Sequence, residues 1–328
     1  MARDLTKTIA VSGSLAQDRI MVFPGKFSDH ILPGKAHILN ISFATDALKE
    51  SWGGTAGNIA FNLSLLGEDP ALLGVAGEDF TEYRNWLRKN KLDTSFIKTI
   101  KGTRTAAAHM ITDKADNQVI AYYSGPRDDN YPGVVYKLKS VKIAIVAPED
   151  KQRMIAYTRA YKKLKIPYIF DPGQQISSFT GPELGKAIKG SLALVGNDYE
   201  ISVIREKTGL SLKELEDLTE NLIITRGSQG SIIYTKGKKI NIKASSVKSA
   251  LDPTGAGDAY RAGLIYGLSR NWGRKETGQL ASLLAAYAVE KKGTQNHRFS
   301  LKDFKKRYKD NYGHPLNLLG PMRGAGEK

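Results

Sequence analysis

Short apolar runs rich in β-branched residues alternate with longer segments of helical period along most of this 328-residue chain. This alternation is typical of parallel strands joined by crossover helices. We therefore predict an α/β fold with one doubly wound, mainly parallel sheet, formed by a single domain over residues 1–328. The strands are expected at 8–11, 71–75, 141–147, 168–171, 192–196, 222–225 and 231–234, and helices near 58–66, 80–89, 151–163, 212–220 and through most of the chain after Gly255.

Two segments depart from this rhythm. Residues 14–50 contain Pro24-Gly25 and Pro33-Gly34 turns, and residues 98–125 alternate like a hairpin that turns near 115–117. We predict that these excursions form a small β-sheet lid over the carboxyl ends of the main strands, where ligands bind in such folds. The tail 320–328 is expected to be flexible.

Composition excludes several classes of site. The chain has no cysteine, which excludes disulfides, zinc thiolates and cysteine nucleophiles, and its five histidines are scattered. No stretch approaches the roughly 18 apolar residues of a membrane span, so a cytoplasmic protein is expected. The net charge of +16 suits nucleic acid, anionic lipid or an anionic small substrate, but the basic residues are dispersed, which favours solvated surfaces.

The segment "DPTGAGD", Asp252 to Asp258, is the most specific motif. Gly255, Ala256 and Gly257 can turn successive backbone N–H groups toward one point at a helix start, where the dipole favours an anion. Asp258 beside this nest can accept a proton from an attacking hydroxyl, or it can simply stabilise the helix dipole. The motif alone leaves both interpretations open.

Three other segments permit a ligand role beside an ordinary structural one. "GGTAGN" at 53–58 has two interpretations. It is a glycine turn followed by Asn58 as a helix cap, or its glycines let a ligand approach the backbone closely. "TRGSQG" at 225–230 is either a hairpin turn or a nucleotide loop. Asn197 and Glu200 in "GNDYE" are either a helix cap or oxygen donors near Mg²⁺.

Together these segments, in this order, resemble the ribokinase-like (PfkB) family of carbohydrate kinases. "GGTAGN" followed by "LSLLG" resembles the first family signature, and "DPTGAGDAYRAG" matches the second throughout. The likeness runs over nearly the whole chain, and within the family it is greatest to bacterial adenosine kinases of the mycobacterial type. The resemblance implies transfer of the γ-phosphate of ATP to the 5′-hydroxyl of adenosine, with Mg²⁺ and a monovalent cation such as K⁺ as cofactors.

The resemblance also implies residue roles. Asp258 would be the general base, and Gly255, Ala256 and Gly257 the anion hole. The implied nucleoside site consists of Ser14, Asp18, Ser42, Gly54, Asn58, Tyr122, Gln174 and Gln175. The implied ATP site consists of Asn197, Thr225, Arg226, Gly227, Ser228, Gln229, Gly230 and Gly257, and Asn197 and Glu200 would serve Mg²⁺ through water. Ala108 stands where the mycobacterial-type enzymes carry an aromatic, so Tyr122 alone would stack on the purine.

The implied partners are adenosine and ATP, with a homodimer formed through the lid and neither a membrane nor a specific nucleic acid. Two alternatives stay open. One is a purine nucleoside kinase of broader specificity or a sugar kinase of the same family. The other is a non-catalytic nucleic-acid-binding protein on this scaffold, which the +16 charge motivates.

Overall fold

The computed structural model describes residues 8–31, 41–115, 117–128 and 130–318. Its main sheet has nine strands in the order β13-β12-β11-β10-β9-β8-β1-β4-β5. The strands from β11 to β5 are parallel, and β12 and β13 add an antiparallel edge. Their bounds are β1 Ile9–Ser12, β4 Ala71–Gly77, β5 Ile97–Ile100, β8 Ile143–Val146, β9 Tyr168–Phe170, β10 Ala193–Asn197, β11 Asn221–Thr225, β12 Ser231–Thr235 and β13 Lys238–Ile242.

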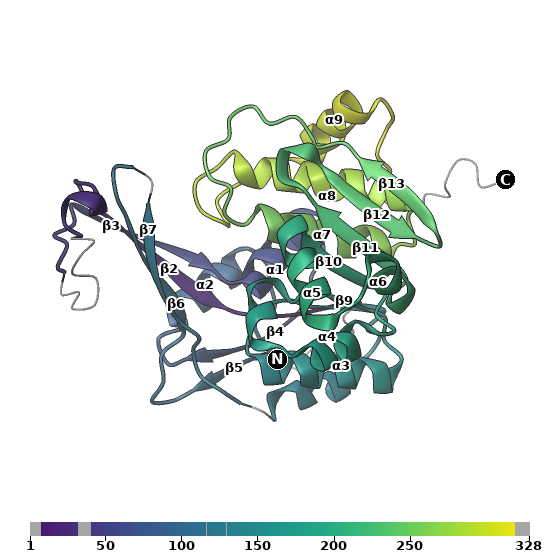
Figure 1. Ribbon diagram of the computed structural model, residues 1–328, viewed down its shortest axis with the longest axis horizontal. Helices are drawn as coiled ribbons and strands as arrows, with labels where there is room; N and C mark the ends of the chain where they lie inside the picture. Colours follow the sequence, from purple (N-terminus) through teal and green to yellow (C-terminus); the bar gives the residue numbers. More distant parts are fainter. Residues whose placement is uncertain (1–7, 32–40, 116, 129, 319–328) are drawn as a thin grey trace.

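Helices cover both faces of this sheet (Figure 1). Alternate strand residues point to opposite faces, so Val11 packs in one core layer and Ala10 in the other. The first layer contains α1 Thr55–Leu65, α2 Thr81–Lys89, α7 Ala256–Ser269, α8 Arg274–Val289 and α9 Leu301–Tyr312. The second contains α3 Lys151–Leu164, α4 Gly181–Ile188, α5 Asp198–Thr208 and α6 Leu212–Leu218. The predicted doubly wound α/β fold is confirmed.

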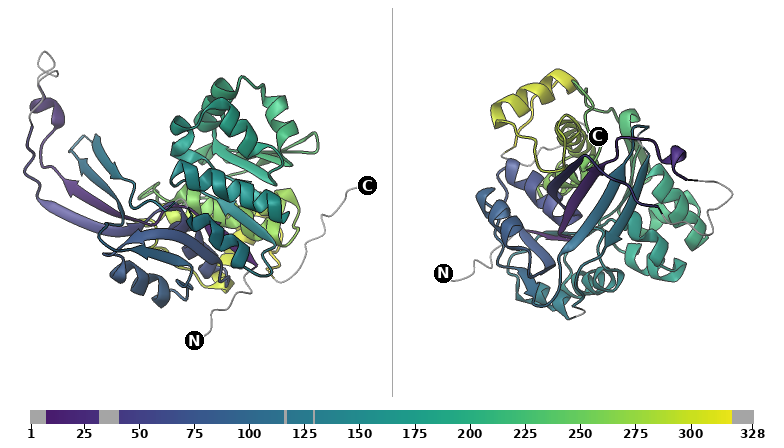
Figure 2. Two further views of the ribbon diagram at one scale, coloured as in Figure 1. Left: turned by 90° about the horizontal axis from the view of Figure 1, so that it is seen from below. Right: turned by 90° about the vertical axis from the view of Figure 1, so that its left-hand side faces the viewer.

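A separate four-stranded sheet, which we call the small sheet, projects from one side of the molecule (Figures 1 and 2). Its order is β3-β2-β6-β7, with β2 parallel to β6 and the outer pairs antiparallel. The bounds are β2 Ala16–Val22, β3 Ala47–Gly53, β6 Ala106–Thr112 and β7 Gln118–Tyr123. The two predicted excursions therefore supply one sheet, and the hairpin turns where it was predicted, since Asp113 Oδ1 accepts from Ala115 and Asn117 N–H.

The boundaries differ from the predictions in two places. The start of the 98–125 excursion is β5, which pairs with β4 at the edge of the main sheet. Helix α1 begins at Thr55, so Asn58 lies inside its first turn instead of opening it. The glycines on either side of Thr55 disguise the helix start, because glycine disfavours helix by about 1 kcal/mol relative to alanine.

Some elements were not predicted at all. Strand β13 (KKINI) has three exposed residues among its five, and helix α4 is a short amphipathic segment between β9 and β10. For α5, only its start at Asn197 was predicted, as one of two interpretations of that segment. The Pro33-Gly34 turn and the tail 320–328 lie outside the described residues.

Candidate functional site

The parallel strands end at one edge of the main sheet, and the predicted site residues gather there. Ser14 follows β1, Asn197 ends β10 and Thr225 ends β11, where Asn197 and Thr225 are register partners. Gln174 and Gln175 follow β9 in a short 3₁₀ segment, η4 Gly173–Ser178. The topology thus brings distant parts of the chain to the edge where doubly wound folds bind ligands.

Helix α7 starts at this edge with the predicted nest. Gly255 is the N-cap with φ +80°, and a Cβ there would lie 3.0 Å from Thr294 Cβ, so glycine suits both the backbone angle and the space. Ala256 and Gly257 are the first two helical residues. The Ala256 N–H donates to Pro253 O over 3.2 Å, and the Gly257 N–H lies in the first turn, where the helix itself supplies no acceptor. Asp258 is the third helical residue. The local geometry is therefore that of an anion-binding helix start.

The Asp258 carboxyl is held by a residue far away in the chain. Asn58 Nδ2 on α1 donates to Asp258 Oδ2 over 2.8 Å. Burial raises the pKa of Asp258 to about 7, while the Asn58 bond and the Arg261 charge oppose this rise. A carboxyl with a pKa near neutrality is suited to exchange a proton with a substrate hydroxyl.

Asp18 lies next to the glycine pair. A Cβ on Gly53 would stand 2.4 Å from Asp18 Oδ2, so the absence of a side chain there makes room for the carboxylate. Gly54, at φ +84°, passes so close to Ser14 O and Ala16 N that a Cβ would lie 2.5 and 2.6 Å from them. Burial and the nearby Asp252 charge raise the pKa of Asp18 to about 6.

The small sheet presents Tyr122 on the same face as Asp18. Asp18 is the register partner of Ala108 on β6, and Ala108 is the partner of Tyr122 on β7. Burial raises the pKa of Tyr122, and Asp18 acts on it in the same direction. Ser14 is the other neighbour of this face, and its Oγ accepts from Thr55 N–H at the start of α1 over 3.1 Å.

Three predicted nucleoside residues are not held in this cluster. Ser42 is exposed beside Phe43, which packs against Phe23 and Phe27 beyond the end of β2. Gln174 is exposed, and Gln175 Oε1 accepts from Ser178 Oγ over 2.8 Å. Among the described residues no contact joins Ser42 to Asp18, so its role stays a prediction.

Asn197 and Glu200 form a capping box at the start of α5. Asn197 Oδ1 accepts from Glu200 N–H, and Glu200 Oε2 accepts from Asn197 N–H, both over 2.7 Å. The box leaves Glu200 Oε1 for another donor or ligand. Glu200 is also 3.9 Å from Arg261 Nη2, and burial raises its pKa.

The 225–230 segment is a hairpin turn that also lines a cavity. It joins the antiparallel strands β11 and β12 through the 3₁₀ turn η5 Gly227–Gln229. A cavity of about 570 Å³ is bordered by this turn, by Ala256 and Gly257 of α7, and by α8. Arg226 and Gln229 do not line the cavity: Gln229 is exposed and its carbonyl accepts from Arg226 Nη2 over 3.3 Å.

Sequence reasoning missed a buried ion pair beneath the nest. Arg261, one turn after Asp258, binds Asp171 through Nε (2.7 Å) and Nη2 (3.1 Å), and its Nη1 donates to Gly257 O over 3.3 Å. Arg261 is 6% exposed and Asp171 2% exposed. An arginine among the apolar residues of a buried helix signals a partner, but the sequence does not say which carboxylate it is.

The donors at this edge suit Mg²⁺ bound together with phosphates. In the described part of the chain no group of three or more His, Cys, Asp or Glu side chains could hold a metal by itself. Mg²⁺ commonly binds one or two carboxylates, several waters and the phosphate oxygens of its substrate. Glu200 Oε1 beside the Asn197–Thr225 strand ends meets that requirement.

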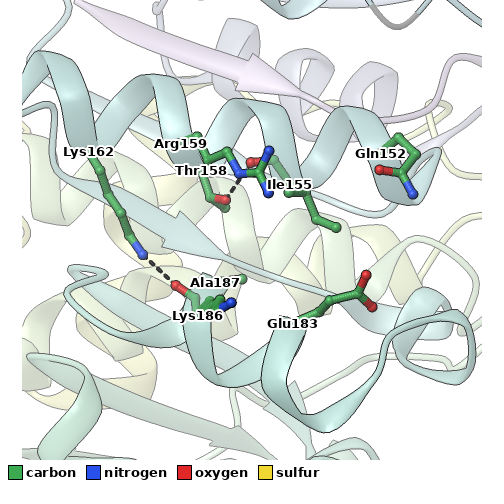
Figure 3. A pocket seen from close by; sticks show the side chains of 8 residues that line it. All are labelled: Gln152, Ile155, Thr158, Arg159, Lys162, Glu183, Lys186 and Ala187. Atoms are coloured by element: carbon green, nitrogen blue, oxygen red, sulfur yellow. Dashed lines mark hydrogen bonds between the residues drawn. The ribbon is translucent and has the colours of Figure 1, made fainter.

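A second hollow, of about 420 Å³, lies between α3 and α4 (Figure 3). Six of its eight lining residues are polar or charged, Arg159, Lys162, Lys186 and Glu183 among them, and the Lys162 ammonium donates to the Lys186 carbonyl. These residues belong to the outer faces of two helices and not to the strand ends.

Among the described helices, none has the length and apolar character needed to cross a bilayer.

Known proteins match this chain over most of its length. The family model of the pfkB family carbohydrate kinases matches residues 29–299. A nucleoside kinase of Methanothermobacter thermautotrophicus is 31% identical over 284 residues, which cover 84% of this chain and 90% of that protein. A nucleoside kinase of Methanocaldococcus jannaschii is 29% identical over 264 residues, covering 79% of this chain and 85% of that protein.

Solved structures agree with this result. The nucleoside kinase of Burkholderia thailandensis in complex with inosine has a TM-score of 0.84 and 33% identity, and the match covers 94% of this chain and 99% of that one. The same enzyme in complex with ADP-inosine has a TM-score of 0.84, with 97% and 100% of the two chains covered. With the nest, Asp258 and the ribokinase-like sheet in place, the chain belongs to the pfkB family of carbohydrate kinases.

Proposed function

We propose that this protein is an ATP-dependent nucleoside kinase that phosphorylates the 5′-hydroxyl of purine nucleosides, adenosine among them. The observation that carries the proposal is Asp258, a carboxyl with a pKa of about 7 at the start of α7, between the 570 Å³ cavity and Asp18. The nucleoside kinases similar to this chain, one of them bound to inosine, support a purine nucleoside as acceptor.

In this proposal ATP lies in the cavity beside the 225–230 turn, and the nucleoside lies between Asp18 and Tyr122. Asp258 accepts the proton of the 5′-hydroxyl as its oxygen attacks the γ-phosphorus, and ADP leaves. The Gly257 N–H, together with the Ala256 N–H once it turns from Pro253 O, stabilises the charge on the transferring phosphoryl group. Bound Mg²⁺ would neutralise phosphate charge next to Glu200 and Asn197.

Asp18 is suited to grip the ribose. Its carboxylate lies against Gly53 and is near enough to Asp258 to raise the pKa of that carboxyl, and it can accept hydrogen bonds from two neighbouring hydroxyls. Tyr122 offers one aromatic wall for the base, while Ala108 opposite its register position offers none. Stacking on one aromatic ring binds a purine without contacting its 6-substituent. This favours an enzyme that accepts both adenosine and inosine over one that accepts adenosine alone.

A coupled assay of ADP formation with Mg-ATP tests this function. The acceptors are adenosine, inosine, guanosine, cytidine, ribose and fructose 6-phosphate. We expect turnover with adenosine and inosine and none with the two sugars. Turnover with a sugar and with no nucleoside would refute the assignment as a nucleoside kinase. Turnover with adenosine alone would refute the proposed acceptance of several purine nucleosides.

A further inference from the structure

Behind Asp258 lies a chain of hydrogen bonds between buried side chains that the proposed mechanism has not used. Trp86 Nε1 on α2 donates to Gln295 Oε1 over 2.9 Å. Gln295 Nε2 lies 3.0 Å from Asn58 Oδ1 and 2.7 Å from Tyr83 Oη. Asn58 then donates to Asp258. Gln295 is 2% exposed and Asn58 4% exposed, so water does not compete for these bonds.

The Trp86 indole determines the direction of each hydrogen bond from Trp86 through Gln295 and Asn58 to Asp258. An indole N–H can only donate, so the Gln295 atom facing Trp86 must be the carbonyl oxygen. The Gln295 amide nitrogen therefore faces Asn58, and the Asn58 atom that it meets must be an oxygen. This leaves the Asn58 nitrogen, a donor in either protonation state of its partner, directed at Asp258.

The surroundings are shaped to allow this chain. A Cβ at Gly57 would lie 1.9 Å from Tyr83 Oη and 3.2 Å from Gln295 Nε2, so a glycine in the first turn of α1 lets both groups approach. Tyr83 Oη accepts from Gln295 and donates to Gly53 O over 2.7 Å, which ties the same amide to the turn beside Asp18.

We propose that Gln295, oriented by Trp86, is a positioning residue for phosphoryl transfer: its amide holds Asn58 with the nitrogen toward Asp258. This inference rests on the proposed function, because it assigns Asp258 a substrate proton. The Asn58 bond occupies Asp258 Oδ2 and thereby directs Oδ1 to the substrate hydroxyl. It also stabilises the ionised carboxylate that can act as a base.

Other charges near Asp258 come from three elements and are unchanged by a substitution at Gln295. They are Arg261 on α7, Asp171 after β9 and Asp18 on β2. A neutral replacement of Gln295 thus alters the orientation of Asn58 without altering the charge around Asp258.

The experiment compares Gln295→Met with the control Gln279→Met. Gln279 is a second buried glutamine, which accepts from Tyr308 Oη over 2.8 Å in α8, away from Asp258. We expect Gln295→Met to lower kcat about tenfold to a hundredfold, because an Asn58 that is no longer held loses its hydrogen bond to the charged Asp258 carboxylate, and to leave the KM for ATP unchanged. The control should keep the wild-type kcat.

A double-mutant cycle separates positioning from a general structural effect. In an Asn58→Ala background, Gln295→Met should change kcat by less than about twofold, because its effect passes through Asn58. Full additivity of the two losses would overturn the proposal. If Gln295→Met does not fold, Trp86→Phe keeps the ring, removes the N–H and should lower kcat about threefold to tenfold.

A second readout does not depend on kinase activity. The Asp258 carboxyl signal is followed by ¹³C NMR as a function of pH, and it is identified by its loss in Asp258→Asn. We expect a higher Asp258 pKa in Gln295→Met than in the wild type or Gln279→Met, and an equal pKa would contradict the proposal. If the wild type shows no nucleoside turnover, only the proposed function is refuted. The titration still tests whether Gln295 acts on Asp258 through Asn58.

Discussion

Asp258 occupies the third position of α7, where a carboxylate ordinarily stabilises the helix dipole. The same chain offers a direct comparison in Asp303, which is exposed at the third position of α9 and is bonded to its own cap Ser300. What separates the two is burial and the contact with Asn58 across 200 residues of sequence. That contact, and not the helix position, is what favours a base.

The first prediction at this scale concerns turnover. Asp258→Asn should abolish nearly all ADP formation with adenosine and leave nucleoside binding within about threefold, because binding uses Asp18 and the aromatic wall. Asp303→Asn should leave turnover unchanged. Turnover is read in the coupled assay and binding by calorimetry. A fully active Asp258→Asn enzyme would exclude Asp258 as the base.

A pH dependence follows from the raised pKa of Asp258. The base must be ionised, so kcat/KM should fall about tenfold per pH unit below about pH 7 and level off above it. Stability should show the opposite sign. The folded pKa lies above the unfolded value of about 3.9, so the folded state loses stability as pH rises through that interval.

Asp258→Asn removes this loss. The melting temperature of the variant relative to the wild type should therefore increase between about pH 4 and pH 7. Thermal scans at closely spaced pH values measure this difference, and a difference independent of pH would contradict it.

At the scale of elements, the turn between β11 and β12 shows how a hairpin can also be a ligand loop. Gly230 has φ +84°, and a Cβ there would lie 2.0 Å from Ile242 O on β13. Gly227 has φ +53° but open space around it. The two glycines therefore separate the effect of backbone angle from the effect of a steric clash.

We predict that Gly230→Ala raises the KM for ATP at least about tenfold and destabilises the fold by about 2–4 kcal/mol, because the loop and β13 must move apart. Gly227→Ala should cost only about 1–2 kcal/mol, the usual cost of a left-handed alanine. Urea unfolding and ATP titrations measure both quantities. Equal effects of the two substitutions would contradict the steric argument.

Most elements were predictable because their signals are short in range. The alternation of strand and helix periods, the hairpin around 115–117 and the nest before α7 each depend on neighbouring residues. Strand β5 and the start of α1 were misplaced, since their assignment depends on the edge of a distant strand and on a glycine-rich first turn. The local pattern therefore predicts the type of an element well, and the sheet to which a strand belongs less well.

At the scale of the molecule, the small sheet carries a row of apolar side chains that the described chain covers only in part. Leu48, Met21, Ile111 and Val119 form one row across its strands, and Leu48 and Val119 are 61% and 50% exposed. Contiguous apolar patches on a sheet commonly mark an interface. This row supports the homodimer that the family resemblance implies.

Light scattering after gel filtration tests the dimer. The wild type should have twice the 36.0 kDa chain mass, and Leu48→Lys should be monomeric because it buries a charge in the interface. Leu301→Lys changes a leucine that is 44% exposed on α9, so this control should remain dimeric. A monomeric wild type, or a dimeric Leu48→Lys variant, would refute an interface on this face.

The sequence by itself determined the α/β class, the family, the nest at Gly255 to Gly257 and Asp258 as the candidate base, because each depends on motifs or periods within a few residues. Only the tertiary structure decided which distant groups meet Asp258: Asn58, held by Gln295 and Trp86, and Arg261 with Asp171 beneath the nest. The identity of a polar side chain determines which hydrogen bonds it can donate or accept. Its partner depends on how distant elements pack across the sheet, which the local sequence does not encode.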